Sequence, residues 1–257
     1  MPNFTLPAIV LRRVDFGDYD LILTFFSLKK GKISAIAKSA KKSAKRFGGI
    51  LELFSLLEIV CSSSKDRDLM VLQEANLIDS FSGIRGNLKK TAYASYFAEI
   101  INVWTEAGAK QDNLYLLLHF IFEQLDNCLI PEEIISIIFQ MRFVVIAGIC
   151  PDLSLCMKCR LEIDNIKEDR VAFDISKGGI VCQKCAGASV NRLFLSKGTI
   201  KRLLWIESGD LSKASKIRFT SPAVKEGLDL LESYTAYHLG KELQSFKFLK
   251  QIRKKDE

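Results

Sequence analysis

The sequence is poor in the residue that general acid–base catalysis uses most often. Among 257 residues there are only two histidines, His119 and His238. His119 lies within an apolar helical pattern, where a packed histidine is commoner than a general base. His238 lies near the end of a long helical pattern, where a positive charge suits the helix dipole. The chain also lacks a Gly-x₄-Gly-Lys-Ser/Thr loop, a Gly-x-Gly-x₂-Gly turn after a strand and a His-Glu-x₂-His motif. We therefore expect a protein that is not an enzyme.

Signals for export or membrane insertion are also missing. Residues 1–5 lack the basic start and apolar core of a signal peptide. The longest apolar stretch, residues 134–149, is interrupted by Gln140 and Arg142 and is shorter than the roughly 20 residues that cross a bilayer. We interpret it as a buried helix and expect a cytoplasmic protein without membrane contact. In that reducing compartment, the seven cysteines indicate metal binding or burial rather than disulfides.

The first third of the chain has the pattern of a small β-barrel. Only five prolines and no low-complexity tract occur in the chain, whose length allows one or two compact units. Short apolar runs separated by turns predict five strands within residues 5–80, around 8–11, 21–26, 33–37, 54–61 and 69–75. Five strands without a strong helix favour an OB-fold.

The period of the apolar residues becomes helical after residue 87. Asn87 is a candidate N-cap for a helix that ends at Trp104, and further helices are expected at about 113–126, 131–148, 196–208 and 221–240. The sequence thus predicts an α+β protein, with an N-terminal OB-fold β-barrel followed by an α-helical domain that contains an inserted zinc-ribbon-like module. The expected ranges are 1–82 for the barrel, 83–150 and 191–257 for the two parts of the helical domain, and 151–190 for the insert.

Four cysteines within this insert have the spacing of a zinc site. Cys156 and Cys159 form one Cys-x₂-Cys pair, and Cys182 and Cys185 form another after 22 intervening residues. Four thiolates satisfy tetrahedral zinc and close its coordination shell, so we expect one structural, non-catalytic Zn²⁺ per chain. The residues between the pairs predict a hairpin that returns the second pair to the first. An insert of about 40 residues is too small for a secure core of its own, which gives the metal a purpose.

The other cysteines are expected to be buried rather than to bind metal, and a role for Cys150 as an extra thiol near the metal stays open. The alternative for the paired cysteines is a set of unrelated buried thiols or a redox pair. Cys150 lies just before the insert among apolar neighbours, so we expect it to be buried, although it could be mistaken for a fifth ligand. Cys61 and Cys128 have the pattern of small hydrophobic residues.

The positive charge is concentrated near the N-terminus. Between residues 21 and 51 there are eight basic residues and no acidic one: Lys29, Lys30, Lys32, Lys38, Lys41, Lys42, Lys45 and Arg46. Removing these eight from the 37 Lys and Arg leaves 29 basic residues against 30 acidic ones, so the rest of the chain is nearly neutral. A basic segment on a barrel of this type favours binding to the backbone of single-stranded nucleic acid.

The predicted DNA contacts come from this segment and from the first strand. They are Arg12, Arg13, Lys32, Lys38, Lys41, Lys42, Lys45 and Arg46. Phe25, Phe26 and Phe47 are candidates for base stacking, although core positions suit them better. The alternative is a solvated lysine-rich loop without a ligand.

Several segments resemble the RecO family of bacterial recombination mediators. The resemblance is carried by residues 8–12 and 17–20 at the start, 28–38 around Gly31-Lys32, Arg46-Phe47-Gly48-Gly49 with Leu53-Phe54, 92–96, 148–153 leading into the first cysteine pair, and 237–240 with 245–249. These segments span nearly the whole chain in the family's order. The chain departs from the family at Arg160-Leu161, where a glycine usually follows the first cysteine pair, and at Cys150, where an apolar residue is common.

The resemblance implies a role in recombinational repair. It implies binding to single- and double-stranded DNA, annealing of complementary strands, contact with the C-terminal tail of single-strand-binding protein, and cooperation with RecR to load RecA onto DNA. Such a protein would be associated with the nucleoid. The residues alone leave other classes open: an OB-fold and zinc-ribbon RNA-binding module, a nuclease with an unrecognised carboxylate cluster, or a scaffold that binds no DNA.

Overall fold

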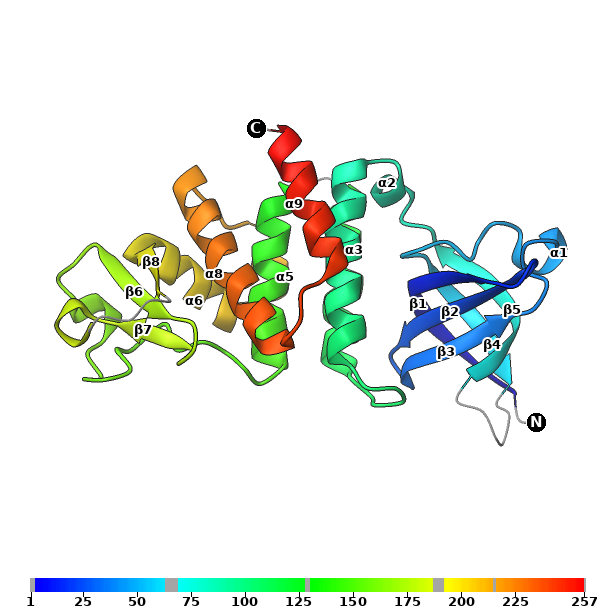
Figure 1. The fold of residues 1–257 in the computed structure, drawn as a ribbon, viewed down its shortest axis with the longest axis horizontal. Helices are drawn as coiled ribbons and strands as arrows, with labels where there is room; N and C mark the ends of the chain where they lie inside the picture. Colours follow the sequence, from blue (N-terminus) through cyan, green and yellow to red (C-terminus); the bar gives the residue numbers. More distant parts are fainter. Residues whose placement is uncertain (1–2, 63–68, 128–129, 187–191, 215, 257) are drawn as a thin grey trace. The chain divides into compact units, whose positions relative to one another are not determined.

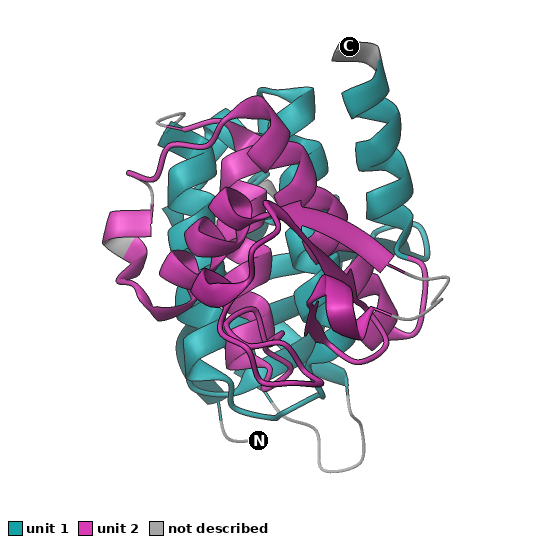
Figure 2. Ribbon diagram, turned by 90° about the vertical axis from the view of Figure 1, so that its left-hand side faces the viewer, with its two compact units in different colours: residues 1–128, 243–257 teal, residues 129–242 magenta. Residues whose placement is uncertain are grey.

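The chain forms two compact units in the computed structural model, which describes residues 3–62, 69–127, 130–186, 192–214 and 216–256. Unit 1 comprises Met1–Cys128 and Leu243–Glu257, and unit 2 comprises Leu129–Glu242 (Figure 2). This division follows packing within each unit. The four domain ranges expected from the sequence describe a different partition and stay a prediction.

Unit 1 begins with a closed five-stranded barrel (Figure 1). Its strands are β1 (Asn3–Phe16), β2 (Asp20–Ser27), β3 (Gly31–Ala37), β4 (Leu56–Ser62) and β5 (Leu69–Asp79). The order around the barrel is β1-β2-β3-β5-β4; β3 and β5 run parallel, and the other pairs run antiparallel. Alternate residues point inward, so that β3 has a strict alternation of buried and half-buried positions. The predicted N-terminal barrel is confirmed.

A short helix, α1 (Ala44–Phe47), interrupts the basic segment between β3 and β4. The sequence did not predict it. Phe47, its last residue, is buried with Leu51 in the hydrophobic core of the barrel. The chain leaves the helix through Gly48, whose φ of 32° lies in the left-handed region. The basic segment is therefore anchored to the barrel by an aromatic side chain.

The other helices of unit 1 pack around α3 (Leu88–Trp104). They are α2 (Ser82–Arg85), α4 (Asp112–Asn127) and α9 (Gln244–Asp256). The side chain of Asn87 accepts a hydrogen bond from the Lys90 N–H, which confirms the predicted N-cap. The sequence did not predict α9, which packs against α3 through stacked rings of Tyr96 and Phe246 with centroids 5.0 Å apart. Glu99 accepts a hydrogen bond from the Ser245 N–H at 2.8 Å, so a carboxylate of α3 lies at the N-terminus of α9.

Unit 2 combines helices with a small sheet. Its helices are α5 (Glu132–Ile146), α6 (Lys197–Ser208), α7 (Leu211–Ala214) and α8 (Ser221–Leu239), and its strands are β6 (Arg170–Asp174), β7 (Gly179–Val181) and β8 (Arg192–Ser196). The sheet has the order β7-β6-β8 with antiparallel pairs. The β6–β7 hairpin was expected, whereas β8 was not. The apolar stretch forms α5, in which even Gln140 is fully buried. Within the described ranges, no helix is long and apolar enough to cross a bilayer.

Glu226 of α8 holds the junction between β8 and α6. Its carboxylate accepts hydrogen bonds from the Ser196 N–H at 2.9 Å and the Thr199 hydroxyl at 2.6 Å, and it forms an ion pair of 3.0 Å with Arg170. Burial acts to raise the pKa of Glu226, but the hydrogen bonds from Thr199 and Ser196 and the charge of Arg170 outweigh it and hold the pKa below its ordinary value. The ionised carboxylate therefore stabilises this junction.

Candidate metal centre and nucleic-acid interface

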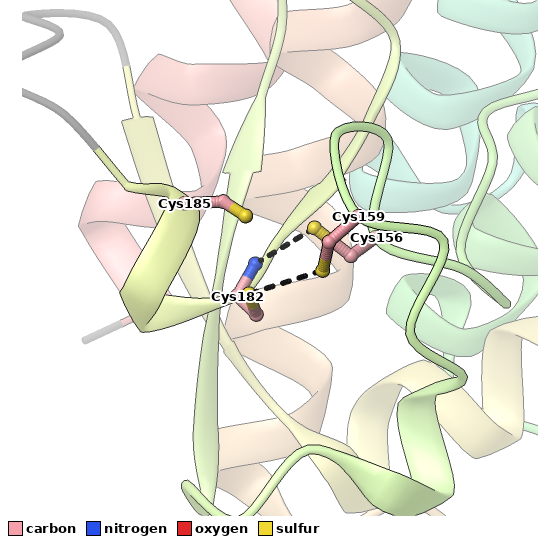
Figure 3. A group of neighbouring side chains, drawn as sticks. All are labelled: Cys156, Cys159, Cys182 and Cys185. Atoms are coloured by element: carbon pink, nitrogen blue, oxygen red, sulfur yellow. Dashed lines mark hydrogen bonds between the residues drawn. The ribbon is translucent and has the colours of Figure 1, made fainter.

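The four paired cysteines come together at one point of unit 2 (Figure 3). Their sulfur atoms all lie within 4.8 Å of one another, and the sulfurs of Cys159 and Cys182 are 3.7 Å apart. The β6–β7 hairpin makes this possible, because β7 ends at Val181 and delivers the second pair to the loop that carries the first. This group could hold a metal ion with four sulfur ligands.

Tight backbone turns orient the two cysteine pairs. In the first, the Arg160 N–H donates to the Cys156 carbonyl and the Cys156 N–H donates to the Leu161 carbonyl, both at 2.8 Å. In the second, the Cys185 N–H donates to the Cys182 carbonyl at 3.0 Å. Arg160 has a φ of 59°, in the left-handed region where a side chain is strained. Arg160, for which the resemblance leads us to expect a glycine, thus has a backbone conformation that glycine adopts readily.

The surroundings of the four thiols favour ionisation of Cys156 and oppose ionisation of Cys185. Burial acts to raise the pKa of Cys156, but hydrogen bonds from the backbone of Cys159, Cys182 and Lys158 outweigh it and lower the pKa to about 6. Hydrogen bonding to the Cys182 and Cys159 side chains raises the pKa of Cys185 to about 12. A divalent cation would remove this opposition, because it offsets the repulsion between neighbouring thiolates. The donor set therefore fits a soft or borderline metal ion.

Cys61 and Cys150, the other cysteines among the described residues, are not part of this group. Cys150 is not among the four clustered residues, but it is exposed, so the expectation that it is buried was wrong. Cys61 is fully buried in the barrel core, as expected. Cys128 lies outside the described residues.

The basic loop, defined here as residues 38–46, lies at one end of the barrel. Lys38, Lys41, Lys42 and Arg46 are exposed, and the Arg46 guanidinium donates to the Lys38 carbonyl at 2.7 Å. Arg13 of β1 and Lys41 line the same surface depression, together with Ala40, Phe47 and Glu52. The structure thus brings five of the eight predicted DNA-binding side chains to one region.

Two of these cations form ion pairs that are exposed to water, which weakens the attraction between the charges. Arg13 forms an ion pair with Glu52 at 2.7 Å, and Lys41 forms one with Asp15 at 2.9 Å. All four side chains are about one-third exposed or more. Exposed ion pairs contribute only about 0–1 kcal/mol each. A phosphate group could therefore displace either carboxylate at little expense.

The other three predicted contacts are placed differently. The Lys32 ammonium lies at the opposite end of β3 from Lys38 and donates to the Asn102 carbonyl in the last turn of α3 at 2.7 Å. Arg12 is exposed on β1, opposite Thr24 of β2. Lys45 is part of α1, and its side chain lies outside what the structure describes. The assignment of DNA contacts stays a prediction. For Lys32, the hydrogen bond to Asn102 does not favour a contact with DNA.

The three phenylalanines considered for base stacking are core residues. Phe25 and Phe26 are fully buried, and Phe47 is almost so. The exposed aromatic residues near the basic loop are instead Phe16 and Tyr19, at the turn between β1 and β2. Their position beside Gly17-Asp18 was a signal in the sequence, because Gly and Asp favour a turn and turns lie mostly on the surface.

The two histidines have packing roles. The His119 ring contacts the rings of Phe81 and Tyr115, as expected of a packed histidine. The His238 ring contacts Tyr234, with centroids 4.5 Å apart, and burial lowers the pKa of His238. The neutral ring is favoured there, so the expected positive charge at the end of α8 is disfavoured.

Comparisons with known proteins cover almost the whole chain. A family model described as "Recombination protein O N terminal" matches residues 1–81, and one described as "Recombination protein O C terminal" matches residues 85–247. The DNA repair protein RecO of Desulfatibacillum aliphaticivorans is 43% identical over 256 residues, 99% of each chain. That of Desulfosudis oleivorans is 41% identical over 258 residues, 98% of this chain and 99% of the relative. That of Syntrophotalea carbinolica is 36% identical over 255 residues, with 98% and 96% covered. The barrel, the cysteine group and these matches together identify the chain as a member of the RecO family of DNA repair proteins.

Proposed function

We propose that the protein is a non-catalytic recombination mediator that binds DNA through its barrel and anneals complementary strands. The basic loop carries this proposal, because it gathers four exposed cations at the barrel, beside Arg13. Cations that neutralise phosphates lower the repulsion between two strands, so annealing by this route needs no nucleotide hydrolysis. The RecO relatives support the same role in DNA repair.

The proposal extends to the partners that the family resemblance implies. In cooperation with RecR, the protein would help to load RecA onto DNA that single-strand-binding protein coats, and it would contact the C-terminal tail of that protein. These steps take place where the chromosome lies, so we place the protein in the cytoplasm, in association with the nucleoid.

We assign the metal to Zn²⁺, one ion per chain, held by Cys156, Cys159, Cys182 and Cys185. Four sulfur ligands leave no open coordination position, so the ion would be structural. When bound, it would fix the loop of the first pair against the turn of the second. Metal analysis of the purified protein should find about one zinc per chain.

A strand-annealing assay tests the function. Replacement of Lys41, Lys42, Lys45 and Arg46 by Glu should abolish annealing, because it replaces four cations by four anions at the proposed contact. The matched control replaces Lys167, Lys177, Lys213 and Lys216, which are exposed in unit 2, and changes the net charge equally. The control should anneal as the parent does. Unchanged annealing in the loop variant refutes the proposal.

The salt dependence of binding provides a second readout. If about four cations contact phosphates, log affinity for single strands falls with log salt at a slope of roughly −3. The loop variant should lose most of that slope. Competition by RNA at matched salt separates a DNA mediator from an RNA-binding module, since a tenfold preference for RNA would favour the latter.

A further inference from the structure

The turn between β1 and β2 exposes three apolar side chains beside the basic loop. Val14, Phe16 and Tyr19 are 37%, 52% and 45% exposed. Val14 and Phe16 lie in the part of β1 beyond Ile9, where its pairing with β4 ends, and they pair with Ile22 and Asp20 of β2. Tyr19 lies in the turn that follows. Single exposed apolar residues are ordinary on protein surfaces, but three within six residues form a local patch.

This turn is connected to the basic loop by specific contacts. The Lys41 N–H donates to the Tyr19 carbonyl at 3.0 Å, and the Ser39 N–H donates to the Asp20 carboxylate at 2.7 Å. The Lys42 ammonium lies 3.4 Å from the centroid of the Tyr19 ring. The Tyr19 ring is therefore held next to a lysine of the basic loop, and Phe16 lies three residues before it at the end of β1.

We propose that Phe16 and Tyr19 stack against unpaired bases of a nucleic-acid strand whose phosphates contact the basic loop. This inference rests on the proposed function and adds to it a preference for single strands. Each base offers a planar face to an aromatic ring, and each phosphate offers a charge to a lysine, so one strand matches both features. The bases of an intact duplex are stacked on each other, and their faces are not available to the two rings.

The position of Lys42 suits this arrangement. Its ammonium lies over the Tyr19 ring, and Tyr19 as a whole is still 45% exposed. A base on the exposed side would place its own phosphate within the reach of the neighbouring lysines. A protein partner is the less suitable occupant, because the apolar patch is small and its surroundings are cationic.

The test compares Phe16→Ala, Tyr19→Ala and the double variant with the parent chain. Binding to a fluorescein-labelled oligo-dT and to a labelled duplex of equal length is measured by anisotropy at several salt concentrations. Each single variant should bind the single strand about tenfold more weakly, and the double variant more weakly still. The salt slope and the affinity for the duplex should be unchanged, because no cation is removed.

Two conservative variants and one control separate stacking from loss of structure or of apolar surface. Tyr19→Phe keeps the ring and should keep the affinity. Phe16→Leu keeps an apolar side chain without a planar ring and should bind single strands as weakly as Phe16→Ala. Phe248→Ala removes an aromatic residue that is 39% exposed on α9 of the same unit and should have no effect.

The outcomes distinguish this inference from the proposed function. If the loop variant loses DNA binding while Phe16→Ala and Tyr19→Ala bind single strands as the parent does, the stacking inference is overturned and the proposed function stands. If the loop variant binds DNA as the parent does, the proposed function fails. If Phe16→Ala loses equal affinity for single strands and for duplex, the preference for single strands is overturned. If Phe16→Leu binds single strands as tightly as the parent, stacking is overturned.

Discussion

Replacement of Gly31 by alanine tests how the barrel is joined to the helices of unit 1. Gly31 begins β3 with a φ of +61°, in the left-handed region. A Cβ atom at this position would lie 1.9 Å from the Ala109 carbonyl oxygen and 2.6 Å from its carbon, both of which are backbone atoms. Two hydrogen bonds cross the same contact, from the Gly108 N–H to the Lys32 carbonyl at 2.9 Å and from the Lys32 ammonium to Asn102 at 2.7 Å.

The magnitude follows from these contacts. A left-handed conformation destabilises alanine relative to glycine by about 1 kcal/mol. Relief of the clash requires the start of β3 to move away from Ala109 and from the end of α3, which disrupts both hydrogen bonds at about 1 kcal/mol each. Gly31→Ala should therefore lower the free energy of unfolding of unit 1 by about 3 kcal/mol.

Gly17→Ala is the matched control. Gly17 has a φ of +58°, but nothing lies within 4 Å of an added Cβ atom. It has the conformational strain without the clash, so about 1 kcal/mol is expected. The difference of about 2 kcal/mol between the two variants then measures the contact between β3 and the loop after α3.

The assay uses the two tryptophans, one in each unit. Trp104 ends α3 in unit 1, and Trp205 lies in α6 of unit 2. In a Trp205→Phe background, urea unfolding followed by fluorescence reports on unit 1 alone. If Gly31→Ala and Gly17→Ala differ by less than about 0.5 kcal/mol, the clash and the two hydrogen bonds contribute nothing, and the reasoning is refuted.

Three further predictions concern unit 2, whose unfolding Trp205 reports in a Trp104→Phe background. Cys159→Ser should reduce bound zinc to well below one ion per chain, whereas Cys150→Ser should leave the content unchanged; equal losses would contradict the four-cysteine assignment. Arg160→Gly should raise the free energy of unfolding by about 0.5 kcal/mol, since glycine accepts the left-handed conformation, whereas Arg160→Ala should not. Glu226→Gln should destabilise the unit by about 2 kcal/mol at pH 7, because hydrogen bonds to a carboxylate are lost. Since the pKa of Glu226 lies below its ordinary value of 4.5 in the folded protein, the difference should be full above about pH 5 and shrink as pH falls below 4.5, and a difference constant from pH 7 to 4 would contradict the role of its charge.

Local patterns predicted most of the elements correctly. Five apolar runs separated by turns sufficed for the barrel strands, and Asn87 marked the start of α3 because a cap acts through the three residues beside it. The spacing of the two cysteine pairs predicted that they cluster, since a hairpin between them brings the second pair back to the first. In each case the interaction that fixes the element lies close in the sequence.

Features that depend on distant partners could not be predicted from the sequence. One is the hydrogen bond from the Lys32 ammonium to the Asn102 carbonyl, which lies 70 residues away. The helix α9 depends on α3 for both its buried face and the carboxylate of Glu99, 146 residues before Ser245. Neither partner can be recognised from composition or period, because helix α9 is polar on most of its surface and packing decides its place.

The return of α9 to unit 1 has a consequence for the order in which the protein is made. Residues 129–242 form a unit of their own, so a ribosome must synthesise this whole unit before α9, which packs against α3, emerges. At about 10 residues per second, this delay is roughly 11 s. During that time the ring of Tyr96 cannot stack on Phe246, and the apolar face of α3 that α9 later covers is exposed. The residues of the barrel have by then all been synthesised. The nascent barrel unit is therefore more exposed to aggregation than its finished form, and a chaperone that shields α3 would act within this interval.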